Sequence, residues 1–117
     1  AAPNFAFELC CKNVRDEDIE GLDLSSLRML VNGAEPVSPA TIARFTARFA
    51  KYGFPPNAMA PVYGLAENSV GLTFPPVGRG PIVDRVQRSA LSRDGQARTR
   101  GCDRARVCGL RPTDRPA

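Results

Sequence analysis

The chain has 117 residues, enough for one modest domain, and carries 16 basic and 12 acidic side chains, a formal net charge of +4. It contains no histidine, which excludes a Ser-His-Asp triad, histidine acid–base catalysis and mixed Cys/His zinc sites. Carboxylates and backbone amides are therefore the main groups left for chemistry.

The charge is divided unevenly along the chain. Residues 1–77 hold 6 basic and 8 acidic side chains, whereas residues 78–117 hold 10 arginines, 4 aspartates and no aromatic residue. With few bulky apolar side chains to offset the entropy of ordering, residues 78–117 are predicted to be a mostly disordered, Arg-rich tail after a folded unit at 1–77. A small non-enzymatic module that binds nucleic acid through this basic tail is the alternative function. The tail has no aromatic residue to stack on a base, which argues against nucleic acid as a partner.

The cysteines have neither the C-x-x-C spacing of a zinc site nor that of a disulfide framework, since they stand as the adjacent pair Cys10-Cys11 and as Cys102 and Cys108. Free thiols in a reducing compartment are expected. No apolar run approaches the eighteen or so residues that span a bilayer, and the N-terminus shows no signal-peptide pattern. The sequence therefore predicts a cytoplasmic chain without a membrane span.

The first predicted elements are a helix and a strand. Apolar residues recur at helical spacing after Pro3-Asn4, which predicts a short helix over residues 4–13. An acidic stretch at 15–20 breaks this pattern. The apolar run at 27–31 is short enough to be a buried strand, and Asn32-Gly33 closes it.

A second helix has the clearest signals in the chain. Ser38 can cap it, Pro39 suits its first turn, and Gly53 lies where the chain must leave it. Its predicted apolar face consists of Ile42, Phe45 and Phe49, and its basic face of Arg44, Arg48 and Lys51. This pattern predicts an amphipathic helix packed on a core.

Two further strands are predicted after this helix. The run at 58–63 reads as a strand in which Pro61 weakens the ladder, and residues 69–74 are a plausible third strand ended by Pro75-Pro76. Strand, helix and strand over 27–63 make a right-handed β-α-β unit of an α/β fold. Parallel strands end at the same sheet edge, where ligands of open α/β sheets bind, so the two loops that follow the strands should emerge side by side.

The first of these loops, Asn32 to Pro36, offers a surface for close approach. Gly33 lets the backbone come near a ligand, Ala34 forms a small wall, and Glu35-Pro36 fixes a turn. These features suit one side of a flat base such as a purine.

The second loop, Tyr63 to Glu67, offers a ring, a glycine and a carboxylate. The Tyr63 ring could lie on a base, Gly64 permits another close approach, and Glu67 can hold Mg²⁺ together with phosphate oxygens. The plainer alternatives are a core tyrosine with a solvated hydroxyl, solvated loop glutamates, and glycines that only form turns.

Four stretches, in order, give residues 1 to about 85 a resemblance to the large domain of the adenylate-forming (acyl-activating) superfamily, and most of all to fatty acyl-AMP ligases and acyl-CoA synthetases. They are Ala2-Pro3-Asn4-Phe5-Ala6-Phe7-Glu8-Leu9, Leu22-Asp23-Leu24-Ser25-Ser26-Leu27-Arg28, Asn32-Gly33-Ala34-Glu35-Pro36-Val37 and Tyr63-Gly64-Leu65-Ala66-Glu67. The resemblance implies an ATP-dependent, Mg²⁺-dependent ligase that activates a fatty acid to an acyl-adenylate and passes it to coenzyme A or a carrier-protein thiol.

The resemblance also implies roles for individual residues. Glu67 would hold the Mg²⁺ and be the catalytic carboxylate, and Tyr63 would stack on the adenine. The remaining nucleotide-binding residues would be Asn32, Gly33, Ala34, Glu35, Pro36, Gly64, Leu65 and Ala66, and those near the acyl tunnel would be Pro3, Asn4 and Phe5.

The sequence also departs from the family pattern. The upstream phosphate loop, the downstream ribose-binding aspartate and the C-terminal domain with its catalytic lysine are absent, and the family's Cys-Gly-x-Pro stretch is matched only loosely by Cys108 to Pro112. We therefore expect a large-domain fragment that is inactive alone. We also hypothesise that the tail is an out-of-frame or otherwise divergent reading, which the other reading frames of the gene would test.

Overall fold

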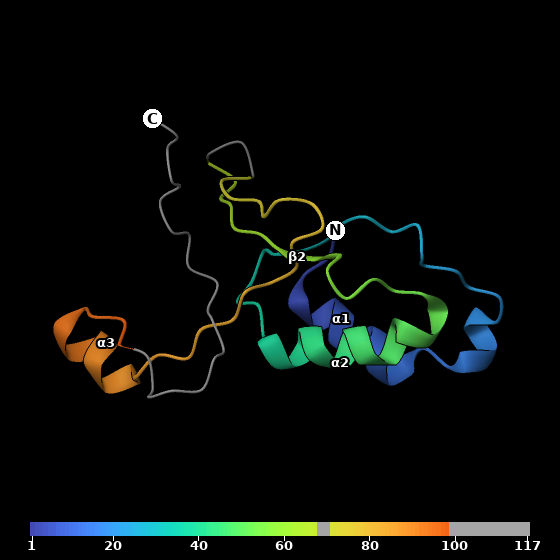
Figure 1. The fold of residues 1–117 in the computed structure, drawn as a ribbon, viewed down its shortest axis with the longest axis horizontal. Helices are drawn as coiled ribbons and strands as arrows, with labels where there is room; N and C mark the ends of the chain where they lie inside the picture. Colours follow the sequence, from blue (N-terminus) through green and yellow to red (C-terminus); the bar gives the residue numbers. More distant parts are fainter. Residues whose placement is uncertain (68–70, 99–117) are drawn as a thin grey trace. The chain divides into compact units, whose positions relative to one another are not determined.

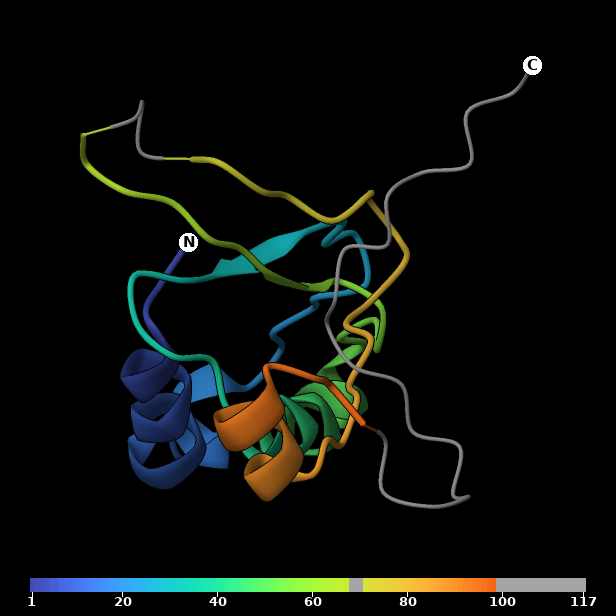
Figure 2. The same ribbon diagram turned by 90° about the vertical axis from the view of Figure 1, so that its left-hand side faces the viewer.

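The computed structural model describes residues 1–67 and 71–98. The chain divides into two compact units, Ala1–Pro81 and Ile82–Ala117. In the first unit α1 (Asn4–Asn13) is followed by the 3₁₀-helix η1 (Asp16–Ile19), β1 (Leu30–Asn32), α2 (Pro39–Phe49), the 3₁₀-helix η2 (Ala50–Tyr52) and β2 (Met59–Pro61). Figure 1 and Figure 2 both place α1 and α2 beside each other on one side of the two strands. The predicted α/β class is confirmed.

The two strands form a small parallel sheet, as the sequence predicts. Leu30 pairs with Met59 and Asn32 with Pro61. Ala2 extends the ladder on the other edge of β1, because its N–H donates to the Val31 carbonyl (2.9 Å) and its carbonyl accepts from the Gly33 N–H (3.3 Å). Strand, helix and strand are thus joined as one β-α-β unit.

The strands are shorter than predicted. Residues 27–29 lie outside β1, since the chain is still turning there and the Leu27 N–H donates to the Leu24 carbonyl (3.0 Å). At its far end β2 stops at Pro61, because Tyr63 leaves the sheet and pairs with Thr73 in an isolated antiparallel bridge. This bridge also corrects the predicted strand at 69–74. Residues 69–70 lie outside the described residues, and 71–74 form no strand, since Pro75-Pro76 offers no N–H to continue a ladder.

Both helices begin where the sequence predicts. The Ser38 hydroxyl accepts from the Thr41 N–H (3.4 Å) with Pro39 at the first helical position, a regular N-cap. The α-helix ends at Phe49 and continues as η2, which Gly53 ends in the left-handed region (φ 79°) that a side chain disfavours. The Gly53 N–H donates to the Ala50 carbonyl (3.0 Å). By contrast the N-cap residue of α1 is Pro3, whose side chain makes no capping hydrogen bond.

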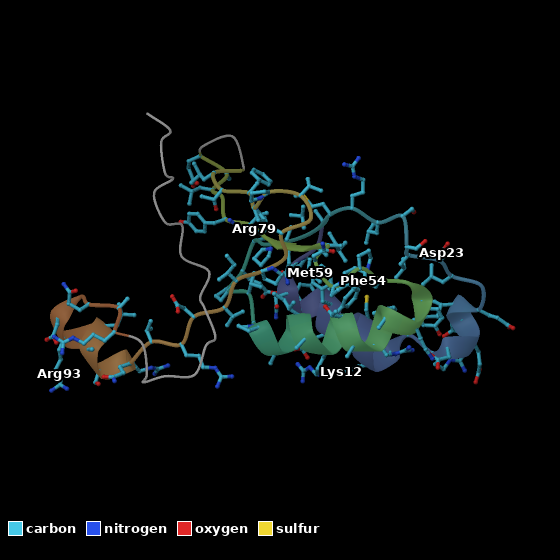
Figure 3. The ribbon with its side chains drawn as sticks, viewed as in Figure 1. Lys12, Asp23, Phe54, Met59, Arg79 and Arg93 are labelled. Carbon is cyan, nitrogen blue, oxygen red and sulfur yellow. The ribbon has the colours of Figure 1, made fainter. Side chains whose placement is uncertain are left out.

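An aromatic cluster between the helices and the sheet forms the core. The ring of Phe45 lies 5.1 Å from Phe7, 4.5 Å from Phe49 and 5.3 Å from Phe54, measured between centroids, and all four side chains are buried. Figure 3 places Phe54 and Met59 between the helices and the strands and Lys12 on the outer side of the helix pair. Burial of each such side chain contributes about 1.5–3 kcal/mol, so this cluster is the main source of stability of the first unit.

The basic face of α2 meets acidic groups from the preceding segments. Arg44 pairs with Glu8 of α1, and the pKa of Glu8 lies below its usual range because Thr41 donates to its carboxylate and Arg44 lies beside it. Lys51 and Arg48 both pair with Asp16 of η1. Hydrogen bonds from Lys51 and Tyr52, with Arg48 adding to them, hold the pKa of Asp16 at about 2.

Asp16→Asn is expected to remove a pH-dependent part of the stability. The folded pKa of Asp16 lies below its ordinary value of 3.8, so its contribution is complete above about pH 4 and is lost as the pH falls towards 2. The variant should therefore be less stable than the parent at pH 7, and the difference should shrink at pH 2. Urea unfolding at both pH values checks this, with Glu17→Gln on the same turn as the control, and an unchanged difference would contradict it.

Two cysteines of the described residues are free thiols. Cys10 and Cys11 are partly buried on α1, and burial raises the pKa of the Cys11 thiol. Cys102 and Cys108 lie outside the described residues.

The second unit contains one helix, α3 (Arg88–Asp94), which ends at Gly95 in the left-handed region (φ 63°). The sequence predicted that residues 78–117 would be mostly disordered, and this seven-residue helix is an exception to that prediction. Residues 99–117 lie outside the described residues. Among the helices of residues 1–67 and 71–98, none has the length and hydrophobicity that a bilayer crossing requires.

Candidate functional site

The loops that follow β1 and β2 lie against each other, as the parallel pairing predicts. The Val62 N–H donates to the Asn32 carbonyl (2.9 Å) just beyond the strands. Gly33 is buried, and a Cβ at this position would stand 2.7 Å from the Val62 Cγ2 and 3.1 Å from the Val62 carbonyl oxygen. Glycine is therefore needed here because the second loop occupies the space that a side chain would fill.

A cavity of about 510 Å³ opens between the two loops and the N-terminal residues. Small and apolar residues line most of it. They are Ala1, Ala2, Pro3, Val31, Gly33, Ala34, Val62, Gly64, Leu65 and Ala66. Six of the residues that the sequence assigned to the site thus line one cavity: Pro3, Gly33, Ala34, Gly64, Leu65 and Ala66.

Ala34 has a strained backbone at the wall of this cavity. Its φ of 67° is the only positive value of a non-glycine residue in the described part of the chain. The left-handed conformation costs an L-residue roughly 1–2 kcal/mol, so contacts around the loop must hold it there.

Glu35 makes one of these contacts, and not with a cavity-lining residue. Its Oε1 accepts a 2.6 Å hydrogen bond from the Phe5 N–H, in the first turn of α1. Because Pro3 has no side-chain acceptor, this carboxylate from thirty residues away caps the helix and lies favourably near its positive end. Sequence reasoning did not find this role, since a cap supplied by a distant loop leaves no local pattern.

Asn4 makes the other contacts. Its Oδ1 accepts from the Ser38 N–H (3.0 Å) and the Asn32 Nδ2 (3.4 Å), and its Nδ2 donates to the Thr41 Oγ1 (3.3 Å). Asn32 is fully buried, and its Oδ1 has no hydrogen-bond partner within residues 1–67 and 71–98. The network of Asn4, Asn32 and Ser38 was also missed, because its members are dispersed in sequence.

The predicted ring and carboxylate of the second loop are open to solvent. Tyr63 is 61% exposed, and its backbone is held by the bridge to Thr73 (N–H to carbonyl, 3.3 Å). Glu67 is exposed at the end of the loop. Within the described residues no three His, Cys, Asp or Glu side chains are grouped to hold a metal ion.

The remaining predicted residues do not line the cavity. Pro36 is exposed and Phe5 is 57% exposed, while Asn32 and Asn4 lie in the hydrogen-bond network beneath the loop. The structure thus separates the predicted set into cavity-lining residues, residues that support the loop, and exposed residues that do not line the cavity.

The curated proteins that resemble the chain are named as fatty-acid–AMP or fatty-acid–CoA ligases. No family model matches it. The long-chain-fatty-acid–AMP ligase FadD26 of Mycobacterium tuberculosis is 44% identical over 103 residues, 88% of this chain and 18% of that protein. FadD26 of Mycobacterium marinum is 45% identical over 92 residues, 79% of this chain and 16% of that protein. A Mycobacterium tuberculosis protein named as a fatty-acid–CoA ligase, fadD25, is 43% identical over 97 residues.

Solved structures agree with these relatives. One, from work on fatty acyl-adenylate ligases of E. coli and L. pneumophila, superposes with a TM-score of 0.81 at 36% identity and covers 87% of this chain and 18% of that one. A fatty acyl-adenylate ligase of L. pneumophila in complex with acyl adenylate and pyrophosphate gives 0.66 at 38% identity over 74% of this chain and 16% of that one. The chain spans 16–18% of the length of these relatives.

The match also covers much of the Arg-rich segment. It includes 103 residues of the chain in the Mycobacterium tuberculosis FadD26 comparison, so it reaches residue 103 or beyond. The similarity therefore continues past the predicted boundary at residues 77–78.

Proposed function

We propose, from this homology to one segment of the fatty acyl-AMP and fatty acyl-CoA ligases, that the chain carries the adenine-facing half of an ATP-dependent ligase site. The reaction would activate a fatty acid to an acyl-adenylate and pass the acyl group to coenzyme A or to a carrier-protein thiol. The single observation that carries the proposal is the convergence of the two loops on one cavity.

The residues around the cavity fit a flat, largely apolar base. Gly33, Ala34, Gly64 and Ala66 have small side chains or none, so a purine in the cavity could approach the backbone. The exposed Tyr63 ring, in the same loop as Gly64 and Ala66, would stack on it. Asn32, Glu35 and Pro36 would then act by fixing the loop that lies along the adenine.

Glu67 would hold Mg²⁺ as a single carboxylate, together with phosphate oxygens and water, which is a usual donor set for this ion. Bound there, the ion would neutralise charge on the leaving pyrophosphate when the fatty-acid carboxylate attacks the nucleotide. Pro3 lines the cavity and would contact the acyl group, with Asn4 and Phe5 next to it in sequence.

We expect no acyl-adenylate from the isolated chain. The chain matches 16–18% of the length of its relatives, and Glu67 alone does not complete the charge stabilisation that phosphoryl chemistry needs. Pyrophosphate release from ATP and a fatty acid, lost in Glu67→Gln, would overturn this expectation.

ATP binding is the direct test. Titration of ATP with Mg²⁺ into the ¹⁵N-labelled chain is expected to shift the backbone amide signals of residues 33–35 and 63–66. Tyr63→Ala should weaken binding by about 1–3 kcal/mol, the contribution of stacking a base on an aromatic ring. Glu67→Gln should abolish the part of the affinity that depends on Mg²⁺.

Two matched variants serve as controls. Tyr52→Phe changes the other tyrosine, and Glu17→Gln changes an exposed glutamate of η1, so neither touches the cavity. The absence of an ATP-dependent shift in both loops, or equal weakening in the controls, would refute the nucleotide site. Salt-dependent binding of RNA or DNA in its place, lost on deletion of residues 79–117, would favour the basic-tail alternative.

A further inference from the structure

We propose that Asn4 is a positioning residue for the nucleotide-facing loop, and not a contact of the acyl chain. The inference rests on the proposed function and adds to it the group that holds the loop in its binding conformation. It depends on three hydrogen bonds that connect the start of α1 to successive points of the segment 32–38.

The Asn4 side chain binds both ends of this segment. Its single Oδ1 accepts from the Asn32 Nδ2 (3.4 Å), at the first residue of the segment, and from the Ser38 backbone N–H (3.0 Å), at the last. One oxygen atom therefore fixes the distance between the two ends.

The neighbouring residue holds the middle of the segment. The Phe5 N–H donates to the Glu35 Oε1 (2.6 Å), so residues 4 and 5 together contact the loop at its start, centre and end. The strained residue, Ala34 (φ 67°), lies between the first and second of these contacts. A left-handed alanine persists only where its surroundings restrict the chain, and these bonds supply that restriction.

The direction of the Asn4 amide is itself fixed. The Glu8 carboxylate can only accept, so Thr41 must donate its hydroxyl proton to Glu8 (2.5 Å), and the Thr41 oxygen is then the acceptor for the Asn4 Nδ2 (3.3 Å). This leaves the Asn4 Oδ1 turned towards Asn32 and Ser38. Arg44 also pairs with Glu8, which keeps that carboxylate ionised and the chain of bonds in one direction.

Two substitutions of Asn4 test whether its side-chain oxygen positions the loop or whether the side chain only fills space. Asn4→Ala removes the oxygen that holds the loop. Asn4→Asp keeps an oxygen acceptor for Ser38 and Asn32 but loses the amide donor to Thr41. Asn13→Ala, at the other end of the same helix and exposed to solvent, is the matched control.

The first measurement needs no ligand. In the full 117-residue chain, hydrogen exchange of the Ser38 amide is expected to accelerate at least tenfold in Asn4→Ala and to remain close to the parent rate in Asn4→Asp and Asn13→Ala. The amides of β1 and β2 should keep their parent protection in all three variants. An unchanged exchange rate of the Ser38 amide in Asn4→Ala would overturn the inference. An equal loss of protection at the amides of β1 and β2 would also overturn it, because it would indicate a general loss of structure.

The second measurement uses ATP with Mg²⁺ as the probe. Asn4→Ala should reduce the affinity at least fivefold and Asn4→Asp should retain it, whereas a contact with the acyl chain would leave ATP affinity unchanged in both. If the parent chain binds ATP and Asn4→Ala binds it with the same affinity, the inference is overturned and the proposed function stays intact. A parent chain that does not bind ATP would refute the proposed function, and with it the nucleotide role of Asn4, while Ser38 exchange would still report whether Asn4 holds the loop.

Discussion

Phe45→Ala is expected to lower the free energy of unfolding of the first unit by about 3–5 kcal/mol, the usual cost of truncating a buried phenylalanine. Phe45 is 6% exposed and its ring contacts those of Phe7, Phe49 and Phe54, so the substitution leaves a cavity between both helices and the chain that follows them. A loss of this size is a large share of the roughly 5–15 kcal/mol that stabilises a typical domain.

Urea unfolding followed by circular dichroism measures this loss, and Phe5→Ala provides the matched control. The Phe5 side chain is 57% exposed on the other side of α1, so its truncation should change stability by less than about 0.5 kcal/mol. A Phe45→Ala variant that unfolds at the same urea concentration as Phe5→Ala would show that the aromatic cluster is not the core of the folded chain.

Gly33→Ala is expected to separate the two loops of the candidate site and to destabilise the chain by about 1–3 kcal/mol, the usual range for overpacking. Gly33 does not have a positive φ, so alanine would gain about 0.4–1 kcal/mol from the reduced entropy of the unfolded chain. The contact of 2.7 Å with the Val62 Cγ2 and 3.1 Å with the Val62 carbonyl outweighs this gain. Shifts in the amide signals of residues 62–66 would report the displacement.

A double-mutant cycle with Val62→Ala identifies the cause. Because Val62→Ala removes Cγ2 and leaves the carbonyl, Gly33→Ala should cost less in that background than in the parent, with a coupling energy of at least about 0.5 kcal/mol. Additive effects would mean that the two loops do not press on each other at this point.

The second helix was predictable from local residues because its signals are local. Ser38, Pro39 and Gly53 set its ends through backbone chemistry within one turn, and Ile42, Phe45 and Phe49 recur at the helical period, so the buried face followed from spacing alone. The parallel pairing of β1 and β2 also followed, since a strand, a helix and a strand close in sequence favour that crossover. The strand ends did not follow, because Tyr63 pairs with Thr73 and not with the sheet.

The candidate site was predictable as a place but not as a set of contacts. Residues that follow parallel strands meet at one edge, which is why Gly33, Ala34 and Gly64 line one cavity. Glu35 was expected along the adenine, and in the structure its carboxylate caps α1. The assignments of Tyr63 and Glu67 stay predictions, to be tested with ATP and Mg²⁺.

By itself, the sequence determined the kinds of element, their order and the edge at which two loops meet, because these depend on periodicity, capping and strand direction within short stretches of chain. Only the tertiary structure decided which side chains hold those loops. The bonds from Asn4 to Ser38 and from Phe5 to Glu35 join residues 34 and 30 positions apart, and the close contact of Gly33 with Val62 depends on the register of the sheet. Such pairings arise when separate elements pack together, so no local pattern of residues encodes them.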